Sequence, residues 1–311
     1  NMPNIRALNP ELQAIALKEL NEVPERIDQD IAALRLWIEQ QPHLKARTND
    51  QFLVNFLRGC KYSLEKTKSK LDRFYTLRTK FPSYFLAHNV DVDELLKLFS
   101  FGTFIVLPRP LNDNGPRIIL LRMAAYDPDK YQFADINRAA GLMFQIMLDE
   151  DDYTTVNGTM TIVDLDNVKA GHFLQMTPTT TKKLVVFQEE ALPVRTKATH
   201  FINLPTGFDT IFNMFKPMMS KKQQGRLHVH GSNLKSLYKH IPQEYLPVEY
   251  GGANGSIAEI VKDWEKRIDA YRDYWVEEQQ YGTDESLRAG KPVDFESLFG
   301  LEGSFRQLNV D

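Results

Sequence analysis

The chain of 311 residues contains one cysteine, Cys60, and no apolar run near the roughly 18–20 residues that a membrane-spanning helix needs. A single cysteine excludes an internal disulfide and suits a reducing compartment. The first residues, NMPNIRALNPEL, lack the basic-then-apolar pattern of a secretory signal. The net charge is only −3, so the chain as a whole has no nucleic-acid signature. We therefore expect a cytoplasmic protein.

Motifs of catalysis are also missing. The sequence has no G-x-S-x-G elbow, no phosphate-binding loop and no G-x-G-x-x-G after a strand. His228 and His230 would share one strand face and could chelate a metal, but no cysteine or H-E-x-x-H accompanies them. Asp164 and Asp166 end an apolar run, where acidic sites and turn caps both occur, and we favour the turn. The sequence predicts no enzyme, no cofactor and no metal site.

The first ninety residues are predicted to be helical. Apolar residues recur at helical spacing in four segments, which indicates a small bundle over residues 9–90. Asn9 with Pro10 is typical of a helix start, as is Asp50, and Gly59 is typical of a helix end. The plainest role for such a bundle is to stabilise a larger domain.

Beyond residue 100, predicted strands and helices alternate. The segment FIVLPRPLNDNGPRIILLRM contains two strands around a turn, and Pro108 and Pro110 favour an edge position for the first. Apolar runs at 158–166, 199–205 and 226–231 read as further strands, with helices between them. This alternation predicts an α/β domain over 95–255. A further helix and a polar surface tail, starting near residue 281, are expected over 256–311.

Positive charge is concentrated between Glu190 and Glu244. This stretch holds eight lysines or arginines and one acidic residue, a net charge of +7, which leaves −10 for the rest of the chain. Such a patch attracts an anionic surface. A solvated face that only maintains solubility is the plainer alternative.

The segment that leads into these cations is unusually apolar. Phe208, Ile211, Phe212, Phe215 and Met219 recur at the spacing of one helix face, two more methionines widen that face, and a proline at 217 ends or kinks the helix. Two interpretations fit this pattern. The helix is either a lid over an apolar cavity whose outer edge touches lipid, or an ordinary core helix followed by a basic loop.

Several sequence pieces together resemble the CRAL-TRIO lipid-binding family, in particular its α-tocopherol transfer and retinaldehyde-binding branch. They are INLP at 202–205, FKP at 215–217, HVHG at 228–231 and LPVEYGG at 246–252, preceded by NFLRGCKYSLEKT at 55–67 and IVDLDN at 162–167. The resemblance spans roughly residues 30–275. It implies a helical N-terminal region and an α/β lipid-binding domain with a mixed sheet, an apolar pocket and a mobile gate helix over about 208–219.

The resemblance also implies site residues by position. A basic cluster for phosphoinositide headgroups would comprise Lys61, Arg195, Lys197, Lys222 and Arg226, although Cys60 stands where the family has an arginine. A hydrophobic ligand pocket would be lined by Gly141, Gln145, Val163, Leu184, Phe187, Leu192, Thr199, Phe208, Ile211, Phe212 and Phe215. A filled core is the plainer alternative for these same residues.

The functional expectation is non-enzymatic transfer of a hydrophobic molecule between membranes. The leading ligand classes are retinoids and tocopherols, held with a small polar end towards Gln145 or Thr199; carotenoids and sterols remain open. We expect a monomer that docks peripherally on anionic membranes containing phosphoinositides. The alternative is a phospholipid or phosphoinositide transfer or sensor protein. In the resembled phosphatidylinositol-transfer branch an acidic residue occupies the position of Val194, and its absence here disfavours that alternative.

Overall fold

The computed structural model describes residues 2–86 and 91–299 and contains a five-stranded mixed sheet in the order β2-β3-β4-β5-β6. Strand β2 lies at one edge and is antiparallel to β3, whereas the later strands are parallel. The predicted α/β class, the mixed sheet and the edge position of the first strand are confirmed. The strands are β2 Phe104–Val106, β3 Arg117–Arg122, β4 Thr159–Asp164, β5 Thr196–Ile202 and β6 Leu227–Val229.

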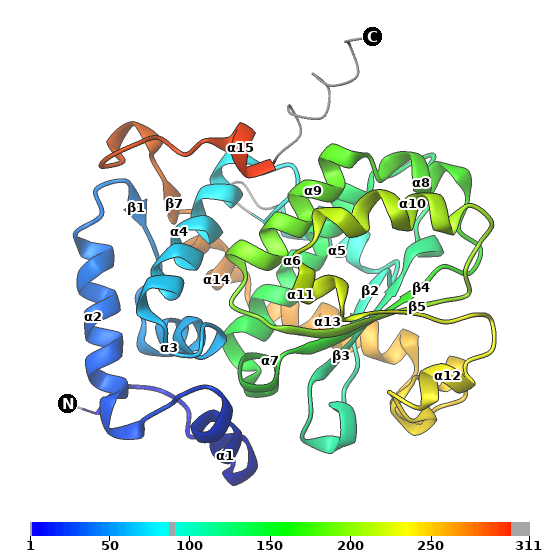
Figure 1. The fold of residues 1–311 in the computed structure, drawn as a ribbon, viewed down its shortest axis with the longest axis horizontal. Helices are drawn as coiled ribbons and strands as arrows, with labels where there is room; N and C mark the ends of the chain where they lie inside the picture. The colour runs from blue at the N-terminus through cyan, green and yellow to red at the C-terminus, as the bar shows by residue number, and fades with distance from the viewer. Residues whose placement is uncertain (1, 87–90, 300–311) are drawn as a thin grey trace.

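The N-terminal region is helical, as predicted, and lies beside the sheet domain in Figure 1. Asn9 caps the first helix, with its side chain accepting a hydrogen bond from the backbone of Leu12. The third helix is capped by Asn49 rather than by Asp50, because the Asn49 side chain accepts from Phe52 while Asp50 pairs with Arg35. The helices of this region are α1 Pro10–Glu19, α2 Ile27–Glu39, α3 Asp50–Gly59 and α4 Leu64–Lys80. The next helix, α5 Val92–Phe99, packs in the core of the sheet domain against α6.

The crossover helices follow the predicted alternation. Thr177 caps α9, as its position before a proline indicates. Within the described residues, no helix combines the length and the apolar character needed to cross a bilayer. The bounds are α6 Phe133–Glu150, α7 Asp152–Asn157, α8 Ala170–Gln175, α9 Pro178–Val186, the π-helical turn η4 Phe187–Ala191, α10 Phe208–Phe215, the 3-10 turn η5 Lys216–Met218, α11 Lys221–Gln224 and α12 Lys235–Tyr238.

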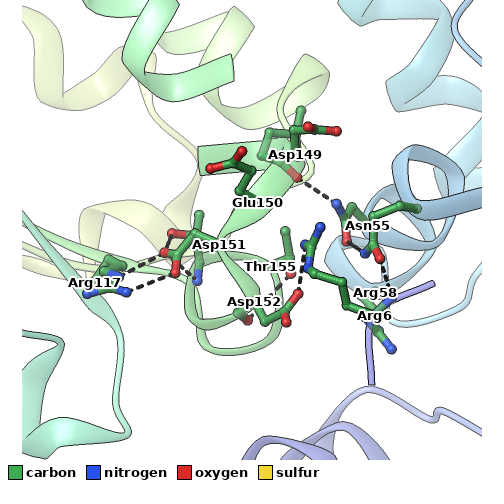
Figure 2. Close-up of polar contacts among 12 residues, drawn as sticks. Arg6, Asn55, Arg58, Arg117, Asp149, Glu150, Asp151, Asp152 and Thr155 are labelled. Carbon is green, nitrogen blue, oxygen red and sulfur yellow. Dashed lines mark hydrogen bonds and ion pairs between the residues drawn. The ribbon is translucent and has the colours of Figure 1, made fainter. Parts of the chain in front are cut away.

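A polar junction at the end of α6 joins the helical region to the sheet (Figure 2). Asp151 caps α7 and receives both Nε and Nη2 of Arg117 on β3, at 2.9 and 3.0 Å. Asn55 on α3 donates to the backbone oxygen of Leu148 at 2.6 Å, and Arg6 pairs with Asp152 at 3.0 Å. Strand, crossover helix and N-terminal region are therefore tied together at one place.

The C-terminal segment differs from the prediction in two ways. One helix was expected over about 255–275, but α13 Ile257–Ala270 and α14 Arg272–Glu278 are separate, because the chain turns at Tyr271. The segment after α14 was expected to cover the surface, but it also packs against the N-terminal region. Strand β7 Gly282–Thr283 pairs with β1 Leu44–Lys45, and α15 Phe295–Phe299 sets two phenylalanines against Phe81. Residues 87–90 and 300–311 of the predicted regions 9–90 and 256–311 lie outside the described residues.

Candidate functional site

A cavity of about 1030 Å³ lies between the sheet, α6, α9 and α4. Side chains alternate along a strand, so one face of β3, β4 and β5 forms its floor. That face carries Ile119, Leu121, Thr159, Thr161 and Thr199, all of which line the cavity. The volume is at the upper end of the roughly 300–1000 Å³ typical of ligand pockets. The space is therefore sufficient for one large lipophilic molecule.

The interior of the cavity is mainly apolar. Phe104, Phe133 and Phe144 line it, and Phe187 lines it while stacking on Phe85 at a ring-centroid distance of 4.1 Å. Gly141 on α6 leaves room for a neighbouring segment, because a Cβ at this position would lie 3.1 Å from the Cβ of Leu86, which is a tight contact. An apolar guest would replace water along these walls.

The interior also holds one polar network. Gln145 donates to the Tyr274 hydroxyl at 3.0 Å, and its side-chain oxygen lies 3.5 Å from Nη1 of Arg78. That same guanidinium nitrogen pairs with buried Glu278 at 3.1 Å. Gln145 and Arg78 both line the cavity, so they offer a fixed polar point to the small polar end of a ligand. The hydrogen bonds of this network are complete without a ligand. The network is therefore stable when the cavity holds no ligand, and it would orient the polar end of a ligand that binds.

Cations surround the mouth of the cavity. They come from the α3–α4 turn, from α4, from the segment before β5, from α11 and from the residue before β6, and they include Lys61, Lys66, Lys70, Arg195, Lys222 and Arg226. The charge of Arg226, then burial, then the charges of Lys61 and Arg195 lower the pKa of Lys222. Burial, followed by the charge of Arg195, lowers the pKa of Lys197. This mutual repulsion favours an anion at the mouth.

The cations are held in place by backbone contacts. Arg226 donates Nη1 to the backbone oxygen of Thr196 at 2.7 Å, and Lys70 donates to that of Leu192 at 2.8 Å. The end of α3 approaches the loop before β5 so closely that a Cβ at Gly59 would lie 1.8 Å from the Pro193 oxygen. Only glycine permits this approach, and the approach brings Lys61 next to the cations of β5.

Helix α10 of the predicted lid, residues 208–219, packs against α9 (Figure 1), and Met219 at the end of the lid lines the cavity. Its aromatic face packs on Phe201 of β5, with ring centroids at 5.5 Å for Phe208, 5.6 Å for Phe212 and 6.2 Å for Phe215. At its end, the backbone and hydroxyl of Ser220 donate to the Glu189 carboxylate at 3.1 and 3.2 Å. The lid is therefore held by an aromatic cluster and by one polar latch.

The structure brings together part of the predicted pocket. Gly141, Gln145, Leu184, Phe187, Leu192 and Thr199 line the cavity. Val163 lies on the same strand face as Thr161 but beside Phe201, whose ring and those of the lid fill that end. For the same reason Phe208, Ile211, Phe212 and Phe215 are not among the residues lining the cavity.

Of the predicted basic cluster, Lys61, Arg195, Lys222 and Arg226 lie at the mouth, and Lys197 is outside the lining. Lys66 and Lys70 also line the cavity but were not predicted from the sequence; they are spaced i, i+4 on α4 and so share one helix face. This i, i+4 spacing is the sequence pattern from which the two lysines could have been added to the basic cluster. Cys60 also lines the cavity, and burial raises the pKa of its thiol.

Asp164 has a turn-stabilising role, as favoured from the sequence. Its carboxylate accepts from the backbone of Asp166 at 3.0 Å and from the Asn203 side chain at 2.9 Å, and it also accepts from the Tyr250 hydroxyl. These contacts fix the residues that follow β4 and β5, the latter just before the lid begins at Phe208.

Comparison with known proteins gives two family matches. Residues 102–252 match the CRAL/TRIO domain, and residues 23–95 match the Pinta-like UBA domain. The chain is 30% identical over 276 residues to alpha-tocopherol transfer protein-like of Homo sapiens, covering 88% of this chain and 78% of that protein. It is 30% identical over 246 residues to Clavesin-1 of Rattus norvegicus, covering 79% and 69%. The solved structure of Sfh5 aligns with a TM-score of 0.45 and 13% identity over 85% of this chain and 99% of that one.

Proposed function

The chain belongs to the CRAL/TRIO domain family, and from this premise we propose that it binds a hydrophobic small molecule and transfers it between membranes without chemical change. The observation that carries the proposal is a cavity that combines an apolar interior with a cationic mouth. This combination fits an amphiphile, because the apolar part is buried while anionic lipid headgroups meet the cations.

The interior favours a ligand with one long apolar body. Burial contributes about 0.8 kcal/mol for each CH₂ group, so roughly twenty carbons provide ample affinity with a single polar contact. Gln145, held by Arg78 and Tyr274, supplies that contact. Retinoids and tocopherols have this shape, and a relative's name refers to tocopherol transfer. We therefore place them first among ligand classes.

We assign membrane docking to the cations at the mouth of the cavity. Lys66, Lys222 and the arginines at 195 and 226 surround it, and the lid ends beside them at Ser220. Anionic headgroups bound there would lie next to the polar latch that holds the lid. The protein would then contact membranes peripherally, and phosphoinositides would be the preferred anionic lipids because each carries several charges.

The cationic mouth also supports a second candidate, in which the cargo itself is a phospholipid. Its acyl chains would occupy the cavity, and its phosphate would meet Lys70 and Arg226. The two candidates differ in the ligand that occupies the apolar interior. It is a retinoid or tocopherol in the first and the acyl chains of a phospholipid in the second.

The test is an exchange experiment with defined vesicles. The full chain is incubated with donor vesicles containing α-tocopherol, all-trans-retinol or phosphatidylinositol, then separated and examined by native mass spectrometry. We expect one tocopherol or retinol per chain, and faster delivery to acceptor vesicles containing phosphatidylinositol bisphosphate. Capture of phosphatidylinositol alone would support the second candidate. No retained lipid from any donor would refute both.

A further inference from the structure

Four histidines gather on the face of the sheet opposite to the cavity. His200 on β5 is the register partner of His228 on β6, and the two rings stack at 4.7 Å. His240, just beyond α12, lies 4.9 Å from the first ring and 4.7 Å from the second. One ligating nitrogen from each of these three residues lies within 4.8 Å of the others. Neighbouring Thr199 points into the cavity, so His200 points away from it.

The decisive feature is a buried nitrogen without a partner. His200 is completely buried, and its Nε2 has no hydrogen-bond partner among the residues that the structure describes. Buried polar atoms are nearly always satisfied, so an exception of this kind needs an explanation. A bound cation between the three rings would supply the missing partner.

The other nitrogen of His200 is held as a metal ligand requires. His200 Nδ1 lies 2.9 Å from His230 Nε2, and His230 Nδ1 lies 2.7 Å from the Ser236 hydroxyl. If each Nδ1 carries the proton, each ring donates along this chain and the His200 Nε2 lone pair is free. Histidines that bind metals usually donate their second nitrogen in this way. His230 is therefore a positioning residue.

Exposure fits the same interpretation. His228 is partly buried and His240 is exposed. An ion can thus enter from solvent beside His240, and water can occupy a fourth position.

We propose that His200, His228 and His240 form a site for a divalent ion that prefers imidazole, with Zn²⁺ as the ion of choice. Zinc takes three histidines at about 2.0–2.1 Å and leaves a fourth position for water. Binding draws the three nitrogens closer together and turns His228 and His240 out of their present ring contacts. The site would fasten β6 and the segment after α12 to β5.

This ligand set differs from the pair that the sequence offered. His228 and His230 share a strand face, but His230 is bonded to His200 and Ser236. The third ligand, His240, comes from beyond the strand and is brought in by the turn after α12. Outside the cluster, His43 is engaged with Asp72, and both nitrogens of His172 are hydrogen-bonded.

The test titrates tag-free, chelator-treated full chain with Co²⁺ and Zn²⁺. We expect one Zn²⁺ per chain by calorimetry and the visible absorption of four-coordinate Co²⁺. His228→Ala and His240→Ala, which alter partly and fully accessible side chains, should each weaken binding at least about tenfold, and Ser236→Ala by about tenfold. Lys239→Ala is the control next to His240 and should bind like the parent.

Circular dichroism establishes that each variant is folded. Absence of saturable one-to-one binding in the parent would overturn the proposal, as would histidine variants that bind like Lys239→Ala. The titration uses no lipid, so its result is independent of the outcome of the vesicle exchange.

Discussion

Ser220 and Glu189 connect the end of the lid to the turn that follows α9. The serine donates its backbone N–H at 3.1 Å and its hydroxyl at 3.2 Å to one carboxylate oxygen. The same hydroxyl accepts from Gln223 and so caps α11. A carboxylate on one side of the mouth thus stabilises both the closed lid and the helix that carries Lys222.

Replacing this carboxylate should make the lid open more readily. Hydrogen bonds to charged groups contribute about 1.5–3 kcal/mol when buried, and this partly exposed pair should contribute less. We expect Glu189→Ala to accelerate ligand release to acceptor vesicles about fivefold. Glu190→Ala is the matched control, because its carboxylate only approaches Arg73 at 3.9 Å. Equal release from both variants would show that the aromatic cluster alone holds the lid.

Removing two exposed cations from the mouth should weaken membrane docking. Lys66 and Lys222 come from different helices and are both exposed, so Lys66→Ala with Lys222→Ala should leave the fold intact. Each cation near an anionic leaflet contributes about 1 kcal/mol, so the loss of two predicts roughly thirtyfold weaker binding in sedimentation with acidic vesicles. Lys262→Ala with Lys266→Ala removes the same charge from α13. If that control loses as much binding, net charge rather than the mouth drives docking.

Substituting Gly59 should destabilise the junction that positions Lys61. Alanine has the higher helix propensity by about 1 kcal/mol, but its Cβ would lie 1.8 Å from the Pro193 oxygen. Forced overpacking costs about 1–3 kcal/mol, so we expect Gly59→Ala to lower the free energy of unfolding in urea. Gly231→Ala is the control, because its Cβ would meet no atom within 4 Å. Unchanged stability of Gly59→Ala would mean that the loop moves freely.

Local rules predicted much of this fold. Helix starts at Asn9 and Thr177 follow from capping chemistry that operates within four residues. The strands were found from their apolar runs, and the edge position of the first from Pro108 and Pro110. Six of the eleven predicted pocket residues line the cavity, and these were placed by their positions in the family resemblance rather than by periodicity.

The rest depended on contacts between segments far apart in sequence. Nothing near Gly282 indicates that it will pair with β1, and nothing near His240 indicates that it will meet His200. The lid residues were assigned to the cavity because their apolar face needs a partner, but Phe201 proved to be that partner. Periodicity identifies a buried face without identifying what covers it.

The buried ion pair of Glu22 and Arg58 is another contact between distant segments that local sequence patterns do not predict. The two are 36 residues apart, their side chains are 0% and 1% exposed, and Arg58 Nε lies 2.8 Å from the carboxylate. Tyr62 donates to the same carboxylate at 2.7 Å. Breaking a buried pair leaves a charge uncompensated and costs about 3–5 kcal/mol. We expect Glu22→Gln to lower the free energy of unfolding by that amount, whereas Asp269→Asn, from an exposed pair with Arg272, should cost under about 1 kcal/mol.

The pH dependence of stability distinguishes loss of the charge from loss of packing. Burial raises the pKa of Glu22, but the hydrogen bond and charge of Arg58 outweigh it, so the folded-state pKa lies below the ordinary 4.5. A carboxyl with a depressed pKa stabilises the fold fully above 4.5, and this contribution is lost as pH falls through the folded-state value. The difference in unfolding free energy between the parent and Glu22→Gln, measured in urea from pH 7 to pH 3, should therefore stay constant down to about pH 4.5 and then shrink. A difference that stays constant over the whole range would assign the loss to packing, because glutamine does not titrate and the parent would then gain nothing from ionising Glu22.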